Sequence, residues 1–194
     1  MAILTQEQGK KILFLARDAI VSYFGRKKIR IEDRVIEELK EKMPMFVIIK
    51  KKGRLRGSMG FTDARYPIYE GTAKAAVNAA FADPRFPPLE EAELDDITIT
   101  VSVLTSPVLV EVRNPEEYLV KITPGKDGIM IVGTFHSGII LPETAAEHGW
   151  DTKQMLNQCC VKATIAPGSW QDFNLCRIYK FQSHIFSEVI SLQL

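Results

Sequence analysis

The spacing of hydrophobic positions divides the chain into helical and extended segments. Residues 5–24 place apolar side chains along one face of a helix, at Ile12, Leu15, Ala16, Ala19, Ile20 and Tyr23. Thr5 and Gln8 have the spacing of a capping box at the start of this helix, and a glycine follows its last turn. Residues 32–43 predict a shorter amphipathic helix, and residues 68–83 predict a helix whose small side chains favour close packing.

Strand patterns lie between these helices. Residues 45–61 indicate a β-hairpin, because two apolar runs flank the turn sequence KKGR, and residues 128–141 indicate a second hairpin. Residues 96–110 alternate between apolar and polar side chains and predict a strand that Pro107 divides. Residues 175–190 alternate in the same way and predict one long closing strand.

The order of these elements indicates the class of fold. Each hairpin is followed by helix and then by a strand, so the order is duplicated although no sequence repeat is visible. Further short helices are predicted over residues 114–122, 142–150 and 151–165. Helices and strands mix without a βαβ rhythm, which predicts an α+β fold of mainly antiparallel sheets. We expect one domain over residues 1–194, built as two lobes.

Composition and charge exclude several classes of protein. The chain has 194 residues, of which 46% are hydrophobic and 25% charged, and its net charge is +1. These values are ordinary for a globular protein, and the low net charge disfavours broad binding of nucleic acid or of an anionic membrane. Residues 25–30 and 50–56 are basic, and solvated loop charge is the simpler interpretation of both clusters.

The expected compartment is the cytoplasm. No window approaches ~18 uninterrupted apolar residues, so no membrane span is predicted, and the first residues lack the pattern of a secretory signal. The three cysteines provide neither a disulfide framework nor the spacing of a zinc site. A reducing environment fits this usage, and the sequence identifies no cofactor.

The stretch RLRGSMG, residues 54–60, is the main candidate for a site. The guanidinium of Arg56 could clamp a carboxylate or phosphate, and the backbone N–H groups of Gly57 and Gly60 could assist. The alternative is a structural arginine paired with a carboxylate from the other lobe. The spacing of a phosphate-binding P-loop is absent.

Ser58 could act as a nucleophile only beside a base. His136, in a hairpin turn, and Glu143 are the candidates for proton transfer, although no spacing places either beside Ser58. His148 lies near the end of a predicted helix, where it can act as a cap. His184 lies in the alternating pattern of the closing strand, at a position expected to face the surface. A metal site can be drawn from His136, Glu143, Glu147 and His148. Paired carboxylates on a helix usually form a solvated face, so no metal site is predicted.

The stretch DPRFPPL, residues 83–89, is irregular because its three prolines prevent a helix. The simpler interpretation is a loop over the core, with Phe86 buried and Arg85 in a buried ion pair. The functional alternative is that Arg85 belongs to the wall of a binding cleft.

Several motifs together resemble the AMMECR family, the AMME chromosomal region proteins of archaea, bacteria and eukaryotes. The hallmark of that family is a Leu-Arg-Gly-Cys-Ile-Gly hexapeptide, which is Leu55-Arg56-Gly57-Ser58-Met59-Gly60 here. Matching segments then follow in order, namely DPRFPPL at 83–89, VSVLTSP at 101–107, LPETAAEHGWD at 141–151, and CCVKATI at 159–165 followed by a tryptophan. The resemblance covers most of the chain.

The resemblance implies an α+β fold with internal duplication and a cleft beside the hexapeptide, but it supplies no activity. Some bacterial members of the family look fused to a Memo-like domain and a radical-SAM domain. A fusion indicates an association between domains and does not identify a mechanism. Two positions depart from the family pattern. Ser58 replaces the cysteine, and Glu143 stands where a glutamine is common. A serine needs a positioned base where a thiol does not, so thiol chemistry would be lost.

Two functions remain open from the sequence. In the first, the chain is an enzyme on a small anionic substrate or a modified residue, with Arg56 holding the anion, Ser58 lining the site and His136 or Glu143 transferring a proton. In the second, the same region is a non-catalytic module that binds a protein or nucleic-acid partner. The serine in place of cysteine favours the second, because a binding site tolerates that exchange more easily.

Overall fold

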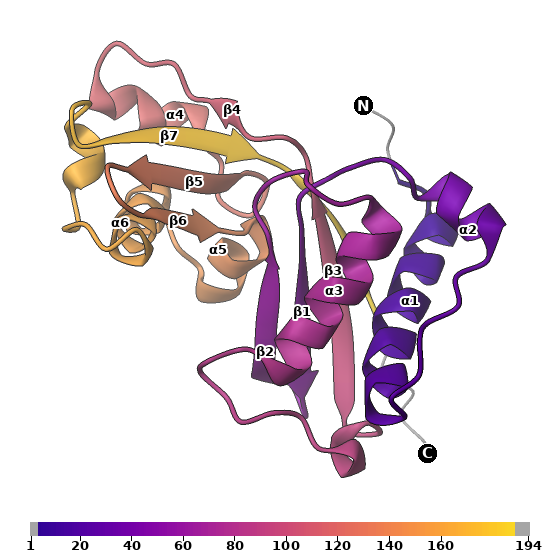
Figure 1. The fold of residues 1–194 in the computed structure, drawn as a ribbon. Coiled ribbons are helices and arrows are strands. Elements are labelled where there is room, and N and C mark those ends of the chain that lie inside the picture. The colour runs from indigo at the N-terminus through magenta and orange to yellow at the C-terminus, as the bar shows by residue number, and fades with distance from the viewer. Residues whose placement is uncertain (1–3, 189–194) are drawn as a thin grey trace. The chain divides into compact units, whose positions relative to one another are not determined.

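The computed structural model describes residues 4–188, which form two compact units (Figure 1). Unit 1 runs to Leu104 and resumes at His184, and unit 2 comprises Thr105–Ser183. Unit 1 contains α1 (Gln6–Phe24), α2 (Asp33–Glu38), β1 (Met45–Lys51), β2 (Arg54–Phe61), α3 (Ile68–Phe81), the 3-10 helix η1 (Glu91–Glu93), β3 (Ile97–Leu104) and β8 (Ser183–Ser187).

Unit 2 has the same kinds of element. It contains β4 (Val108–Leu109), the 3-10 helix η2 (Pro115–Glu117), α4 (Tyr118–Lys121), β5 (Gly128–Gly133), β6 (Ser137–Ile140), α5 (Pro142–His148), α6 (Thr152–Lys162), the 3-10 helix η3 (Ser169–Gln171) and β7 (Cys176–Phe181). The α+β class is confirmed.

The two sheets repeat one arrangement of strands. The first has the order β2-β1-β3-β8, and the second, taken from the other edge, has the order β6-β5-β7-β4. In each, an antiparallel hairpin is followed by helix, and the chain then adds a strand on the free side of the first hairpin strand. The duplicated order of elements predicted from the sequence is therefore confirmed.

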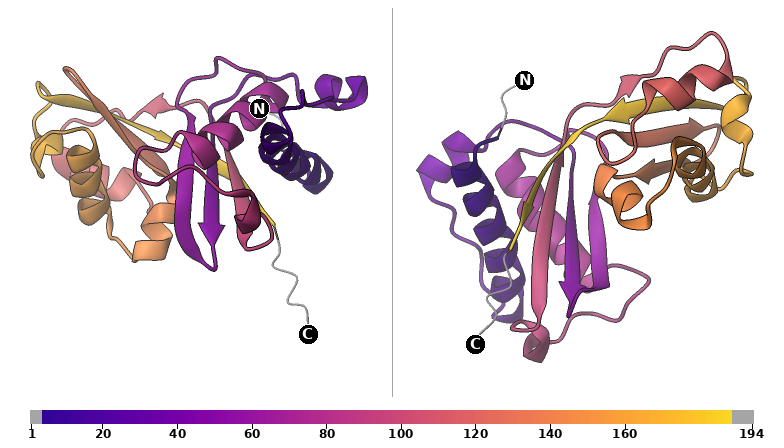
Figure 2. Two further views of the ribbon diagram at one scale, coloured as in Figure 1. Left: turned by 60° about the horizontal axis from the view of Figure 1, so that its bottom comes forward. Right: turned by 180° about the vertical axis from the view of Figure 1, so that it is seen from behind.

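Helices cover one face of the first sheet (Figures 1 and 2). The capping box of α1 is present, with the Gln8 N–H donating to the Thr5 hydroxyl and the Gln8 side chain accepting from the Thr5 N–H. Alternate residues of β1 point into the core, and a run of small side chains lets α3 approach the sheet, namely Ala73, Ala75, Ala76, Ala79 and Ala80. The other face of this sheet carries the alternate side chains of each strand.

The second predicted helix is shorter than expected. The helix over residues 32–43 ends at Glu38, because the following backbone caps α3: the N–H groups of Ile68 and Tyr69 donate to the carbonyls of Glu41 and Leu39. This arrangement satisfies the start of α3, where Pro67 provides no side-chain cap.

The closing strand is divided between the two sheets. Residues 176–181 form β7 in the second sheet, and residues 183–187 form β8 in the first. At the break, the Thr105 N–H donates to the Gln182 carbonyl, and the Gln182 N–H donates to the Thr105 hydroxyl. The segment that leaves unit 1 is thus fastened to the segment that returns.

A glycine on the second hairpin strand of each unit permits the closest helix–sheet contact. A Cβ atom at Gly57 would lie 2.0 Å from the Ala79 carbonyl oxygen of α3, and one at Gly138 would lie 2.4 Å from the Cys159 carbonyl oxygen of α6. Both obstacles are helix backbone, which cannot move aside as a side chain can. Glycine is required at both positions for packing.

We expect Gly57→Ala and Gly138→Ala each to lower the free energy of unfolding by ~3 kcal/mol, because each added methyl group displaces a helix. Urea unfolding followed by circular dichroism measures the effect. Gly25→Ala is the control, since a Cβ atom there has no neighbour closer than 3.6 Å. Variants as stable as the control would contradict this account of the helix–sheet contact.

Candidate functional site

The hexapeptide Leu55–Gly60 lies on β2, which is an edge strand of the first sheet. An edge strand exposes backbone N–H and C=O groups that have no partner strand. Residues 82–93 run beside this edge and are attached to it at two points, one at Ser58 and one at Arg56. We call this segment the edge loop.

The first attachment binds the backbone of Ser58. The buried carboxylate of Asp83 accepts the Ser58 N–H at 2.8 Å, and the Arg85 guanidinium donates to the Ser58 carbonyl at 3.3 Å. Asp83 also accepts the Arg85 backbone N–H, its Nε–H at 2.9 Å and its Nη2–H at 2.7 Å. One aspartate and one arginine thus replace the partner strand for one residue.

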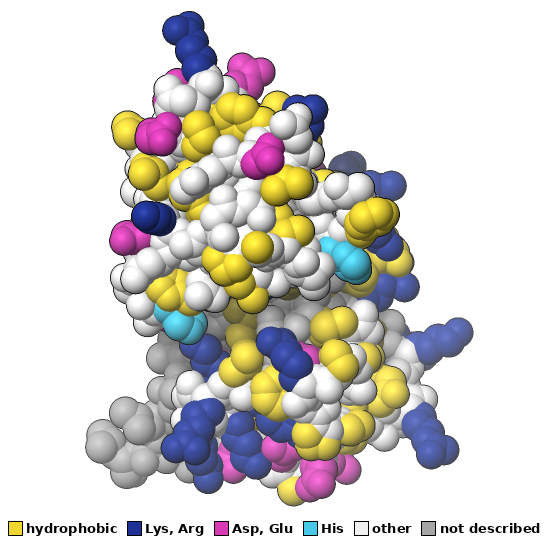
Figure 3. Space-filling view, turned by 90° about the vertical axis from the view of Figure 1, so that its left-hand side faces the viewer, with side chains coloured by type: hydrophobic (Ala, Val, Ile, Leu, Met, Phe, Trp, Pro, Cys, Tyr) yellow, Lys and Arg dark blue, Asp and Glu magenta, His cyan; other side chains and the backbone are white. Residues whose placement is uncertain are grey.

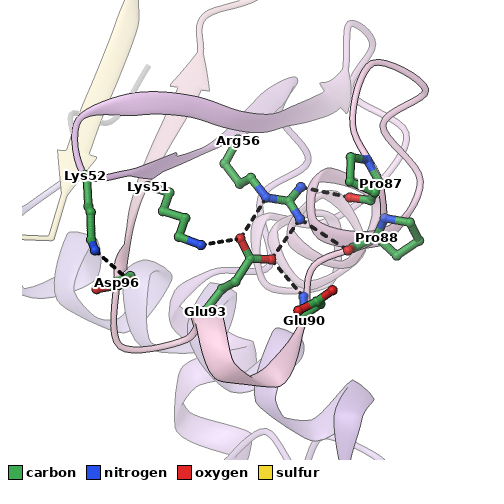
Figure 4. Close-up of polar contacts among 8 residues, drawn as sticks. All are labelled: Lys51, Lys52, Arg56, Pro87, Pro88, Glu90, Glu93 and Asp96. Atoms are coloured by element: carbon green, nitrogen blue, oxygen red, sulfur yellow. Dashed lines mark hydrogen bonds and ion pairs between the residues drawn. The ribbon is translucent and has the colours of Figure 1, made fainter.

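The second attachment binds the side chain of Arg56 (Figure 4). Its Nε and Nη2 atoms donate to the two carboxylate oxygens of Glu93 at 3.1 and 2.8 Å, and its Nη1 and Nη2 atoms donate to the carbonyls of Pro87 and Pro88. Lys51 adds a third cationic contact to Glu93 at 2.9 Å. Arg56 therefore holds the edge loop, and its carboxylate partner comes from its own unit.

Hydrogen bonding keeps both carboxylates ionised. The Arg56 side chain is the main cause that lowers the pKa of Glu93 to about 2, and the backbone N–H of Glu90 and the Lys51 side chain add to it. The Arg85 side chain is the main cause that lowers the pKa of Asp83 to about 2, supported by the Ser58 N–H. Burial opposes both shifts, so the hydrogen bonds dominate.

The Ser58 side chain points away from the helices. Gly57 faces α3, and alternation along the strand sends the next side chain to the opposite face. Ile48 lies opposite Ser58 in the sheet and Thr100 lies opposite Ile48, so a hydroxyl flanks each side of an isoleucine. Among the residues that the structure describes, none hydrogen-bonds to the Ser58 hydroxyl.

Gly60 occupies a position that is closed to other residues. A Cβ atom there would lie 2.2 Å from the Met45 carbonyl oxygen and 2.6 Å from the Phe46 ring. Gly57 and Gly60 thus both serve packing within unit 1, and the hexapeptide is a structural motif at each of these positions.

The proposed bases belong to unit 2, whereas Ser58 belongs to unit 1. His136 is exposed in the β5–β6 turn and Glu143 lies in the first turn of α5, and histidine side chains are visible at the surface in Figure 3. The His148 Nδ1–H donates to the Thr144 carbonyl at 2.9 Å, and the ring stacks on Trp150, which agrees with a helix-end role. In unit 1, His184 on β8 is three strands from β2, roughly 14 Å away.

Cysteines and possible metal ligands both occur in the described part of the chain. All three cysteines are free and buried, and burial raises the pKa of Cys159 to about 12 and that of Cys176 to about 11. No group of three or more His, Cys, Asp or Glu side chains within residues 4–188 is arranged to hold a metal ion. Every helix in that range is too short or too polar to span a bilayer.

Sequence reasoning missed Glu93 and the role of Asp83. A local signal existed for each, since Glu90 and Glu93 have capping-box spacing and do form that box, and Asp83-x-Arg85 has the spacing of a turn-borne ion pair. Neither signal names β2 as the partner. Arg85 pairs with a buried carboxylate as expected, but its own side chain is 53% exposed, and Phe86 is only half-buried.

Fold and motif together define the class: an α+β protein of two duplicated units whose hexapeptide lies on a covered sheet edge. The chain belongs to the AMMECR1 family, whose model matches residues 13–186. It is 38% identical over 188 residues to a protein of Methanothermobacter thermautotrophicus, covering 96% of this chain and 97% of that one. It is 42% identical to Protein MK0488 of Methanopyrus kandleri, covering 95% and 90%.

A solved structure has the same fold. The crystal structure of the uncharacterized protein PH0010 from Pyrococcus horikoshii matches with a TM-score of 0.89 at 40% identity, covering 94% of this chain and 92% of that one. The match extends over nearly the whole of both chains, so both duplicated units are part of the shared fold. The names of these relatives state no activity.

We expect Glu93→Gln to lower the free energy of unfolding at pH 7 by about 2 kcal/mol, because it removes the charge that Arg56 and Lys51 face. The folded-state pKa of Glu93 is about 2, below its usual value of 4.5. The stabilisation is therefore complete above pH 4.5 and is lost as the pH falls toward 2. Urea unfolding across this range should show the gap to wild type narrowing.

The exposed neighbour Glu91 provides the matched control. Glu91→Gln should match the wild type at every pH, because its side chain contacts neither cation. A gap between Glu93→Gln and wild type that stays constant down to pH 2 would contradict the ion-pair account.

Proposed function

We propose that this protein is a binding module that recognises an anionic group of a partner protein beside the hexapeptide, using Arg85 and the hydroxyl of Ser58. The enzyme hypothesis uses the same serine as a reactive group. An enzyme needs a base next to Ser58, whereas a binding module needs groups that hold an anion there. The surroundings of Ser58 in unit 1 favour binding.

The proposal rests on one observation: Arg85 is held rigidly and still presents a free donor. Its Nε and Nη2 atoms are engaged by Asp83 and Ser58, whereas Nη1 has no partner among the described residues. A guanidinium fixed on two sides loses little side-chain entropy when it binds a further acceptor. The Ser58 hydroxyl, which has no hydrogen-bond partner within residues 4–188, adds a second donor.

The charge around the two attachments is also suitable. Arg56, Lys51 and Arg85 provide three cations, against the two carboxylates of Glu93 and Asp83. Within the ion pairs of the two attachments the cations outnumber the carboxylates by one, and Arg85 is the most exposed of the three cations. A carboxylate or phosphate group of a partner is the matching chemistry.

Among the described residues of unit 1, no suitable base for catalysis is bound to the hexapeptide. The carboxylates bound to the hexapeptide have pKa values of about 2, so they take up a proton poorly at neutral pH. An enzyme would depend on His136 or Glu143 from unit 2. Nucleic acid is a weaker candidate for the anion, because affinity for a phosphate backbone needs many cations and the net charge of the chain is +1.

A ligand screen with chemical analysis tests this proposal. Purified protein is screened by thermal shift against carboxylate- and phosphate-bearing metabolites, nucleotides and acidic peptides. A ligand of the folded state raises the melting temperature, and each hit is then incubated with protein and recovered for mass spectrometry. We expect hits to be recovered unchanged, with affinity reduced ~5-fold by Ser58→Ala, the cost of about one hydrogen bond.

Arg85→Gln should abolish the shift. The matched control is Arg65→Gln, because Arg65 pairs with Asp63 through the same Asp-x-Arg geometry, at 2.6 and 2.7 Å, and contacts no part of Ser58. A hit that survives Arg85→Gln would remove the site from the edge loop. A hit that wild type converts to product and Ser58→Ala does not would replace the module with an enzyme.

A further inference from the structure

A second surface of unit 1 has the character of a docking groove. It runs along the outer side of α1, beside the connection to α2, and consists of two adjoining hollows of about 470 and 670 Å³. Both hollows are lined by Phe14, Arg30 and Glu32, so they form one continuous surface. We call this surface the Phe14 groove.

Phe14 is exposed in a way that the fold does not require. Its residue is 71% exposed, whereas Ile12, Leu15 and Ala16 on the same turns of α1 are buried in the core. A large exposed aromatic side chain that lines a hollow is typical of an anchor point in protein recognition. The fold gains no burial from Phe14, which leaves it available to a partner.

One end of the groove is apolar. Leu15, Ile31 and Val35 line the smaller hollow together with the aliphatic stem of Lys10. A hollow of about 470 Å³ has room for one or two large aliphatic or aromatic side chains. This end therefore suits hydrophobic side chains of a partner.

The rim is cationic and its cations are uncommitted. Lys10, Lys27, Lys28 and Arg30 line the two hollows, and none forms a side-chain hydrogen bond or ion pair within residues 4–188. Asp18 and Glu32 are the acidic groups that line the groove. Four unpaired cations against two carboxylates leave a positive surface around an apolar centre.

We propose that the Phe14 groove docks an acidic, amphipathic segment of a partner protein. The hydrophobic side chains of the segment pack on Phe14 and into the apolar end, and its Asp and Glu side chains face Lys27, Lys28 and Arg30. Complementary charge orients the segment in the groove, and burial of its apolar side chains provides most of the affinity.

The carboxylates in the groove select against other anionic partners. Asp18 and Glu32 would face the phosphates of a nucleic acid or of an anionic membrane, and a peptide can place its own cations or neutral side chains there. Single-stranded nucleic acid also binds through successive stacking aromatics, and Phe14 is the one aromatic residue among the described residues that line this groove.

This surface is independent of the edge loop. α1 lies on the helix-covered side of the first sheet, whereas the Ser58 side chain lies on the opposite face. Loss of binding at one surface thus leaves the other available, and the two proposals can fail separately.

The test uses the full chain and a fluorescein-labelled helical peptide of about 15 residues, with Leu at every third or fourth position and Glu between. Fluorescence anisotropy measures the dissociation constant. We expect Phe14→Ser to raise it by at least ~10-fold, and Lys27→Glu with Lys28→Glu to do the same. Raising the salt concentration should weaken wild-type binding, because the charges are exposed.

Matched controls lie in unit 2. Phe135→Ser removes a phenylalanine that is 89% exposed, and Lys126→Glu with Lys153→Glu reverses two exposed lysines. These variants should bind the peptide as wild type does. Equal losses in the control and groove variants, or no saturable binding by wild type, would overturn the proposal.

Parallel measurements test whether the Phe14 groove binds something other than an acidic segment. Saturable binding of the same peptide with Glu replaced by Lys would rule out the acidic partner. Sedimentation that shows a dimer dissociated by Phe14→Ser would make the groove a self-association surface. Binding of phosphatidylglycerol vesicles or an oligo-dT strand in place of the peptide, lost in Phe14→Ser, would assign the groove to a membrane or to nucleic acid.

Discussion

The open edge of β2 is the constraint on which the hexapeptide region depends. An edge strand has backbone groups without a neighbouring strand, and here Asp83 and Arg85 bind those of Ser58. Glu93 fastens the same edge loop through the Arg56 side chain. Asp83 and Glu93 each accept four hydrogen bonds, two of them from one guanidinium. The other two at Asp83 come from the backbone N–H groups of Ser58 and Arg85, and those at Glu93 come from the Lys51 side chain and the Glu90 N–H. Because neither carboxylate has an unused oxygen lone pair to spare, the edge loop is fixed, and the face that carries Ser58 is fixed with it.

The Ser58 backbone and the Ser58 side chain have separate roles, which explains why this position accepts a serine in place of the cysteine of the Leu-Arg-Gly-Cys-Ile-Gly hexapeptide. The fold uses the backbone N–H and carbonyl of Ser58, and its side chain points to the opposite face from the helix that Gly57 contacts. Exchange of a hydroxyl for a thiol changes no bond that holds the edge loop. Arg56, Gly57 and Gly60 have no such freedom, because a guanidinium fork and two backbone-to-backbone contacts depend on them.

Local and pairwise features could be read from the sequence, and long-range pairings could not. The capping box at Thr5, both hairpins and the division at Pro107 follow from spacing and turn chemistry, which act within a few residues. The attachment of Glu93 to Arg56 joins residues 37 apart, and no periodicity encodes it. The prediction of one long closing strand is wrong for a related reason. Apolar and polar side chains alternate in both β7 and β8, and this alternation does not indicate that the chain changes sheet at Gln182.

The path of the chain has a consequence for how the protein is made. Unit 2 is a continuous segment, Thr105–Ser183, whereas unit 1 needs both the first part of the chain and β8, near its end. Glu188, just after β8, accepts two hydrogen bonds from Arg17 of α1 and one from the Ile99 N–H of β3. On a ribosome the inserted unit is therefore synthesised in full before β8 completes unit 1, and Arg17 of α1 is paired only after Glu188 has been added.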